Sequence, residues 1–220
     1  MVLQGLKLIG RGAEADLYLG WFAGMKAIFK WRKPKAYRHP ALDRRIRASR
    51  TLREARIMAE ARLAGVDVPA VLMVDPDEAL LVIEYVEGRL LRDEIGAEPP
   101  EESMRKMRVF GRMVAKLHGT GIVHGDLTTS NVIDTGSRLV LIDFGLAYKT
   151  GRLEDRGVDV HVLLRALEST HPTLAERLYL EFLEGYAEEA GASEAGRVSD
   201  KVREIRLRGR YIEERRMRGS

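Results

Sequence analysis

Apolar and polar residues alternate in short runs through the first third of the chain, which is the pattern of half-buried strands. Glycine turns separate the first three runs, and a turn rich in Asp and Pro separates the last two. The predicted strands span 3–10, 15–21, 25–31, 70–74 and 79–85. One long helix is predicted between them, over 41–65, because apolar residues recur there at roughly helical spacing and Gly65 supplies a stop. The positions that define this spacing are Leu42, Ile46, Leu52, Ile57, Ala61 and Leu63.

The pattern changes to a helical one after residue 100. Helices are predicted over 101–119, 154–170, 173–190 and 196–217, the last ended or interrupted at Arg208-Gly209-Arg210 because glycine is unfavourable inside a helix. A hairpin is predicted from two apolar runs around the turn at 135–137. The buried face of the first of these helices is expected to hold Met104, Met107, Phe110, Val114 and Leu117. The fold class is therefore α+β, with an N-terminal domain over 1–86, mostly sheet with one helix, and a mainly helical domain over 87–220 that ends in a basic tail at about 206–220.

Composition narrows the function classes. The chain has 220 residues, 45% of them apolar, which is enough for a substantial core. It contains no cysteine, which excludes disulfides and thiolate metal sites. No apolar run approaches the ~20 residues of a membrane helix, and the first ten residues read as a strand and not as a signal peptide. We therefore expect a cytoplasmic protein without a membrane partner.

Charge is unevenly distributed. The net charge is only +4, but residues 30–56 hold eleven Lys/Arg against two acids, and residues 201–220 hold eight against three. The residues between these two segments are acidic overall. Clustered cations attract polyanions such as RNA, although a solvated helix face would also explain each segment.

The motif with the strongest chemical meaning is His124-Gly125-Asp126-Leu127-Thr128-Thr129-Ser130-Asn131, followed by Asp143-Phe144-Gly145. An Asp, an Asn five residues later and an Asp-Phe-Gly beyond match the catalytic-loop spacing of protein kinases. Asn131, the only Asn of the chain, and Asp143 offer hard oxygen ligands for Mg²⁺. Asp126 is left to accept a hydroxyl proton or to orient the attacking group.

Three further features suit a nucleotide site. The turn Gly10-Arg11-Gly12-Ala13-Glu14 lies between the first two strands, where its amides can approach phosphates. Lys30 ends the third strand and would pair with phosphates and with a helix glutamate, either Glu54 or Glu60. Backbone groups around Glu84, Tyr85 and Val86 would bind adenine.

On these residues the chain resembles the protein-kinase superfamily and, more narrowly, the small atypical kinase of the KEOPS complex. The narrower resemblance rests on Ile9–Ala15, Lys35–Asp43, Thr170-His171-Pro172 and Arg206–Arg210. It implies a two-lobed kinase-like fold that binds ATP and Mg²⁺, with a small N-lobe and a reduced, helical C-lobe. It implies catalytic roles for Lys30, Glu54 and Asp126, and metal binding by Asn131 and Asp143.

The resemblance also implies partners and a process. The partners are the threonylcarbamoyl-transferase subunit, other KEOPS subunits and tRNA, and the process is threonylcarbamoyl-adenosine (t6A) formation. The basic tail, with Arg206, Arg208 and Arg210, would bind tRNA or a partner protein. Gly125 stands where regulated kinases carry Arg, so control by a phosphorylated activation loop is not expected, and Thr128 stands where they carry Lys, so one cation for the γ-phosphate is missing. Only 75 residues follow Gly145, which leaves little room for the usual peptide-docking subdomain and weighs against broad protein-kinase activity.

Two other functions fit part of the pattern. A small-molecule phosphotransferase of the aminoglycoside type has the same Asp and Asn spacing, but it usually has a larger, acidic substrate lobe. A non-catalytic tRNA-binding scaffold would explain the basic segments, but it would not need Lys30, Asp126, Asn131 and Asp143 together.

Overall fold

A computed structural model of the chain describes residues 5–218, of which 209–218 are described by their backbone alone. These residues form two compact units. The first comprises the described residues through Leu63 together with Val68–Glu87, and the second comprises Ala64–Asp67 and the described residues from Gly88 onward. Among the described helices, none is both long enough and apolar enough to cross a membrane.

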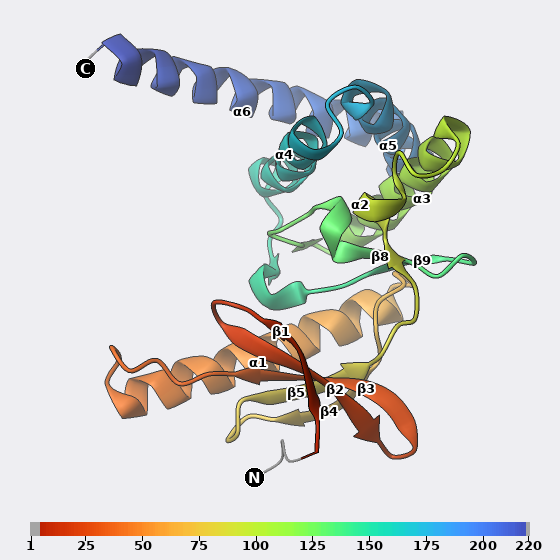
Figure 1. Ribbon diagram of the computed structural model, residues 1–220. Helices are drawn as coiled ribbons and strands as arrows, with labels where there is room; N and C mark the ends of the chain where they lie inside the picture. The colour runs from red at the N-terminus through yellow and green to blue at the C-terminus, as the bar shows by residue number, and fades with distance from the viewer. Residues whose placement is uncertain (1–4, 219–220) are drawn as a thin grey trace. The chain divides into compact units, whose positions relative to one another are not determined.

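The first unit is built on a five-stranded antiparallel sheet (Figure 1). Its spatial order is β1-β2-β3-β5-β4, so the first three strands follow one another as hairpins. The β2–β3 hairpin closes through Ala23 and Gly24, both with positive φ, as a two-residue turn of this kind requires. All five predicted strands are confirmed to within a few residues: β1 Lys7–Arg11, β2 Ala15–Phe22, β3 Met25–Arg32, β4 Val71–Asp75 and β5 Leu80–Glu84. Residues 3 and 4 of the first predicted strand lie outside the described residues.

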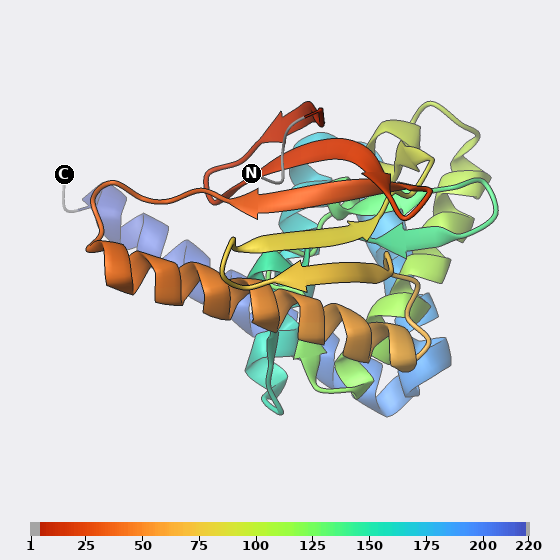
Figure 2. The same ribbon diagram turned by 90° about the horizontal axis from the view of Figure 1, so that it is seen from below.

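One helix, α1 (Pro40–Leu63), lies alongside β4 and β5 (Figure 2). The sheet contributes a small apolar core of Ala27, Phe29, Leu80 and Val82, in which Phe29 and Val82 are cross-strand partners. The position of α1 agrees with the prediction, and two of its six predicted apolar positions, Ile57 and Ala61, are buried. The leucines of that pattern are not, since Leu42 and Leu52 are exposed and Leu63 is 89% exposed.

The buried side of α1 is instead partly polar. It consists of Asp43, Thr51, Glu54, Ala55, Ile57, Met58 and Ala61. Polar groups are tolerated there because each has a partner: Thr51 donates to the carbonyl oxygen of Arg47, Asp43 accepts from Arg47, and Glu54 accepts from Lys30.

The second unit is mainly helical, as predicted. Its long helices are α3 Pro100–Gly119, α4 Leu153–Thr170, α5 Ala175–Ala190 and α6 Ala192–Arg218. The five apolar residues expected on the inner face of α3 are all buried. Helices α3 and α5 approach closely at two glycines, since a Cβ on Gly111 would lie 2.0 Å from the Phe182 carbonyl oxygen and one on Gly185 would lie 1.8 Å from that of Arg108.

Short elements frame the loops of this unit. The predicted hairpin is confirmed as β8 (Val132–Asp134) and β9 (Leu139–Leu141), and β6 (Arg89–Leu90) extends it on the β8 side. Strands β7 (Ile122–Val123) and β10 (Tyr148–Lys149) pair around the segment that carries the kinase-like motifs. Three single helical turns, α2 (Leu91–Glu94), η1 (Thr129–Asn131) and η2 (Phe144–Leu146), complete the unit, and the sequence analysis predicted none of them as helical.

The prediction that Gly209 ends or interrupts the last helix is wrong. Helix α6 continues through Gly209 to Arg218 and projects beyond α4 and α5 (Figure 1). A single glycine costs about 1 kcal/mol in a helix. That cost is small enough for a helix anchored by buried Val198 and Val202 to continue through the glycine.

Candidate active site

Lys30 lies on β3 of the first unit, and its ammonium donates to Oε1 of Glu54 at 2.6 Å. Both side chains are buried. Of the two glutamates that the sequence left open, Glu54 is therefore the one that pairs with Lys30. Lys26, which starts the same strand, has its ammonium 5.7 Å from the ring centre of Tyr85.

The glycine-rich turn joins β1 to β2. The Gly12 amide donates to the Ala15 carbonyl oxygen at 2.9 Å, and a Cβ on Gly12 would lie 2.8 Å from that oxygen. Any other residue would therefore push the turn open. Ala15, at the place of the third glycine of the kinase loop, is buried and pairs with Arg32 across the sheet.

The segment expected to bind adenine follows β5. The amide of Glu84 donates to the Ala70 carbonyl oxygen at 2.9 Å, and that of Tyr85 to the Lys26 carbonyl oxygen at 3.3 Å. The Glu84 carboxylate in turn accepts from the Ala70 amide at 3.0 Å. The sheet thus uses two of the three amides between Glu84 and Val86, which directs the adenine prediction toward Val86.

In the second unit, the catalytic loop holds Asp126 and Asn131 together. The Asn131 side-chain amide donates to the main-chain oxygen of Asp126 at 2.8 Å and to its Oδ2 at 3.0 Å. An aspartate in place of Asn131 would set two carboxylates against each other at this distance. The amide nitrogen of Asn131 is occupied in these bonds, so its Oδ1 is the atom left to bind a cation.

Asp143 reaches the same region through the β8–β9 hairpin. The Ile142 amide, next to Asp143, donates to the Asn131 carbonyl oxygen at 2.9 Å. Asp143 adopts a left-handed conformation with φ of 61°, and its Oδ1 accepts from the Gly145 amide at 3.2 Å. Such strain at a non-glycine residue is typical of functional sites.

The donor set fits Mg²⁺. Asn131 offers an amide oxygen and Asp143 a carboxylate, both hard ligands, and Mg²⁺ commonly takes only one or two protein ligands beside phosphates and water. Within the described residues, no three His, Asp or Glu side chains gather into a metal cage. The pair therefore suits an ion whose other ligands are the phosphates of a nucleotide and water.

Asp159 of α4 anchors the loop that carries Asp126. Its Oδ2 accepts from the His124 amide at 2.7 Å, and its Oδ1 accepts from the Gly125 amide at 2.8 Å. His118 of α3 also donates to Oδ2 at 3.1 Å. Burial acts to raise the pKa of Asp159, but the hydrogen bonds from His118 and His124 outweigh burial and hold the pKa below its ordinary value.

His118 and Tyr186 are residues of this anchor that the sequence reading missed. The Tyr186 hydroxyl lies 3.0 Å from Nδ1 of His118, and both side chains are buried. The available signal was a histidine on the mostly apolar, buried face of an amphipathic helix. That signal alone does not identify its partner, which lies 68 residues away.

The backbone geometry explains why position 125 is a glycine. Its φ is +79°, and a Cβ would lie 2.6 Å from the Leu146 carbonyl oxygen. An arginine, which regulated kinases carry at this place in the motif, cannot take this backbone conformation without strain.

The basic segment 30–56 separates into two sets of side chains. Those on the inner side are ion-paired, for example Lys33 with Asp16 and Arg47 with Asp43. Four arginines on the outer side of α1 are exposed, and no ion pair is found for them within the described residues. They are Arg44, Arg45, Arg53 and Arg56.

The tail arginines are partly neutralised. Arg206 pairs with Glu168 at 2.7 Å, and Arg208 pairs with Glu154 at 2.5 Å. The side chain of Arg210 lies outside the described residues. The tail thus offers less free charge than its composition suggested.

Fold and site together define a protein of the kinase-like class. A model of the protein kinase domain matches residues 3–164. A relative from Pyrococcus abyssi named KEOPS complex subunit Bud32 is 46% identical, over 94% of this chain and 97% of its own length. The mouse EKC/KEOPS complex subunit Tp53rkb is 39% identical, over 96% of this chain and 89% of its own. The chain therefore belongs to the protein kinase domain family, whose members are phosphotransferases, and within it to the family of the Bud32 subunits.

Other relatives are longer. A protein of Methanothermobacter thermautotrophicus named a probable bifunctional tRNA threonylcarbamoyladenosine biosynthesis protein is 42% identical, over 94% of this chain but only 37% of its own length. Two solved structures, of WaaP in complex with acyl carrier protein and of the Rio2 kinase from Chaetomium thermophilum, each give a TM-score of 0.60. WaaP is 18% identical over 91% of this chain and 88% of its own, and Rio2 is 16% identical over 90% and 70%. These two confirm the predicted fold and nothing beyond it.

Proposed function

We propose that the chain is an ATP- and Mg²⁺-dependent atypical serine/threonine kinase and ATPase that serves t6A modification of tRNA as a subunit of a KEOPS-type complex. The single observation that carries the catalytic part is the hydrogen bond between the side chains of Asn131 and Asp126. Asp159 anchors the same loop through the Gly125 amide, and Asp143 reaches the same region of the unit. The names of its full-length relatives support the complex and the process.

Each unit supplies different groups to this chemistry. In the first unit, Lys30 and the amides of the glycine-rich turn would bind phosphates, and backbone groups near Val86 would bind adenine. In the second, Asn131 and Asp143 would hold Mg²⁺, which when bound neutralises negative charge on the phosphates. Asp126, oriented by the Asn131 side-chain amide, would accept the proton of the attacking hydroxyl or water.

Substitution of the two aspartates tests the catalytic assignment. We expect Asp126→Ala and Asp143→Ala each to abolish measurable ATP turnover by the purified chain, while the circular dichroism spectrum stays that of the wild type. Glu189→Ala, which removes an exposed carboxylate of the same unit, is the matched control and should turn over ATP normally. Undiminished turnover by Asp143→Ala would refute the assignment.

The role in the complex needs its own experiment. ATP turnover should be measured for the chain alone, with the threonylcarbamoyl-transferase subunit, and with that subunit and tRNA. We expect stimulation by the partner and t6A formation that depends on Asp126. Equal turnover in all three mixtures, combined with phosphorylation of a small alcohol or aminoglycoside, would favour the small-molecule phosphotransferase instead.

The basic tail is proposed to bind tRNA or a partner protein through Arg206, Arg208 and Arg210. Removal of residues 206–220 should weaken tRNA binding and reduce its salt dependence, because fewer counterions are released. Glu154→Gln, which frees Arg208 from its ion pair, should leave binding intact or strengthen it. A deletion that changes neither affinity nor salt slope contradicts this role for the tail.

A further inference from the structure

Arg32 lies two residues beyond Lys30 on β3 and is only 3% exposed. Residues i and i+2 of a strand point to the same face, so both cations reach Glu54 of α1. They divide its carboxylate between them: Lys30 donates to Oε1 at 2.6 Å, and Arg32 donates to Oε2 at 2.6 Å. With both oxygens occupied, the Glu54 carboxylate is fixed in one orientation.

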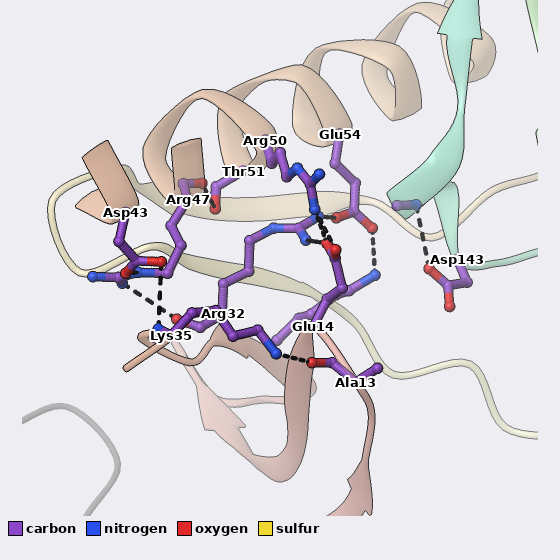
Figure 3. A network of polar contacts seen from close by, with 12 residues as sticks. Ala13, Glu14, Arg32, Lys35, Asp43, Arg47, Arg50, Thr51, Glu54 and Asp143 are labelled. Atoms are coloured by element: carbon purple, nitrogen blue, oxygen red, sulfur yellow. Dashed lines mark hydrogen bonds and ion pairs between the residues drawn. The ribbon is translucent and has the colours of Figure 1, made fainter. Parts of the chain in front are cut away.

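Arg32 also reaches the glycine-rich turn. Its Nη1 lies 3.3 Å from Oε2 of Glu14, at the tip of that turn (Figure 3). Arg50, one helical turn before Glu54 on α1, donates to the same Glu14 carboxylate. Figure 3 shows Glu14 between the two guanidinium groups. Hydrogen bonding to Arg50 and the charge of Arg32 hold the pKa of Glu14 below its usual range, so Glu14 is ionised at neutral pH.

A second contact ties the same turn down. The ammonium of Lys35, in the segment after β3, donates to the main-chain oxygen of Ala13. Two consecutive residues of the turn are thus held by cations that follow Lys30 in the chain. A free carboxylate at a phosphate-binding turn would repel the phosphates. Held by Arg32 and Arg50, the Glu14 carboxylate is instead neutralised and drawn toward α1.

We propose that Arg32 is a positioning residue for nucleotide binding, acting through the chain Glu14–Arg32–Glu54. It fixes Glu54, which aims the Lys30 ammonium, and it sets the position of the glycine-rich turn through Glu14. The proposal rests on the proposed ATP binding by this chain. A buried guanidinium needs partners wherever it lies, so the ion pairs of Arg32 could also serve stability alone. In that case its substitution would lower stability without changing nucleotide binding.

The test compares substitutions at both ends of the chain of contacts. Arg32→Met removes the charge with little change of length, Arg32→Lys keeps the charge but loses the two-pronged donor, and Glu14→Gln keeps the shape of Glu14. Arg53→Met and Glu78→Gln are the matched controls, since both residues are exposed in the same unit and have no ion pair within the described residues. KM and kcat for ATP turnover, direct ATP binding and urea unfolding are measured on the full chain.

We expect Arg32→Met to raise KM for ATP about tenfold or more, since one charge-assisted hydrogen bond corresponds to such a factor. Arg32→Lys should recover part of the loss. Glu14→Gln should raise KM several-fold while its urea midpoint stays at the wild-type value, because Glu14 is half exposed. The double variant Arg32→Met/Glu14→Gln should lose less than the product of the two single losses, as coupled residues do.

A Glu14→Gln or Arg32→Lys enzyme with the KM and the ATP affinity of the wild type would overturn the proposal. A double variant whose rise in KM equals the product of the two single rises would also overturn it, because the two residues would then act independently. Glu14→Gln and Arg32→Lys decide the matter even where Arg32→Met fails to fold. A wild-type chain that neither binds nor turns over ATP refutes the proposed function itself, whereas an active wild type with unaffected variants refutes only the role of Arg32.

Discussion

Removal of the Asp159 carboxylate should destabilise the second unit strongly. The side chain is 2% exposed and accepts hydrogen bonds from the amides of His124 and Gly125 and from the ring of His118. In Asp159→Ala, the buried amide of His124 and the part-buried amide of Gly125 lose their acceptor together. A buried group left unpaired costs about 1–3 kcal/mol and a part-buried one costs less, so we expect a loss of about 2–4 kcal/mol. That is a large share of the roughly 5–15 kcal/mol by which folded proteins are stable.

The conservative variant separates shape from charge. Asp159→Asn fits the same space but presents one NH₂ group toward a donor, so one of the three hydrogen bonds cannot form. We expect about half the loss of Asp159→Ala. The pKa of Asp159 is lowered in the folded protein, so its contribution to stability is present above the ordinary pKa of aspartate and is lost as pH falls through the lowered value. Asp159→Asn should therefore flatten the acid side of the stability profile.

Urea unfolding, followed by circular dichroism, measures both effects. The free energy of unfolding is compared among the wild type, the two variants and Glu189→Ala, which removes an exposed carboxylate. An Asp159→Ala protein within 0.5 kcal/mol of the wild type, with an unchanged dependence on urea, would refute the reasoning. ATP turnover should fall in both variants, because Asp126 lies in the loop that Asp159 anchors.

Three further substitutions follow from close contacts and burial. Gly111→Ala should lower the melting temperature by several degrees because its Cβ would lie 2.0 Å from the Phe182 carbonyl oxygen, while Gly119→Ala, with open space around it, should not lower it. Gly125→Ala should destabilise by about 2 kcal/mol or more in urea unfolding, through its positive φ and the main-chain oxygen 2.6 Å from the added Cβ. Lys106→Met should cost about 1–3 kcal/mol at pH 7, since it leaves the partly buried carboxylates of Asp134 and Glu98 without their shared cation. In the wild type, burial acts to lower the pKa of Lys106, but its hydrogen bonds to Asp134 and Glu98 raise the pKa by more, so the net shift is upward. The contribution of Lys106 to stability therefore persists at neutral pH and is lost only as pH rises through the raised pKa.

The sequence predicted what depends on local pattern. Strand alternation placed all five strands of the first unit, and helical spacing in α3 identified its buried face, because in both cases burial follows hydrophobicity. The pair Asn131 and Asp143 was predicted from motif spacing, and in the β8–β9 hairpin the Ile142 amide, next to Asp143, donates to the Asn131 carbonyl oxygen.

What the sequence did not reveal depends on partners far along the chain. Helix α1 buries Glu54 and exposes Leu52, although hydrophobicity alone predicts the opposite for these two residues. Glu54 is tolerated there only because Lys30 and Arg32, more than twenty residues earlier, supply two charged donors. Such ion pairing overrides the apolar pattern. It cannot be predicted from the sequence of α1 alone, because the two cations lie outside that helix.

The four residues 64–67 belong to the second unit, although both flanking segments belong to the first. The Asp67 carbonyl oxygen accepts from the Leu141 amide at 2.9 Å, and its carboxylate pairs with Arg138 at 2.7 Å. The polypeptide thus passes between the units three times, so a cut at residue 87 would not yield two autonomous pieces. One fragment would keep residues 64–67 without their partners, and the other would lack them. The match to the longer relative from Methanothermobacter thermautotrophicus likewise spans 94% of the chain and so includes parts of both units.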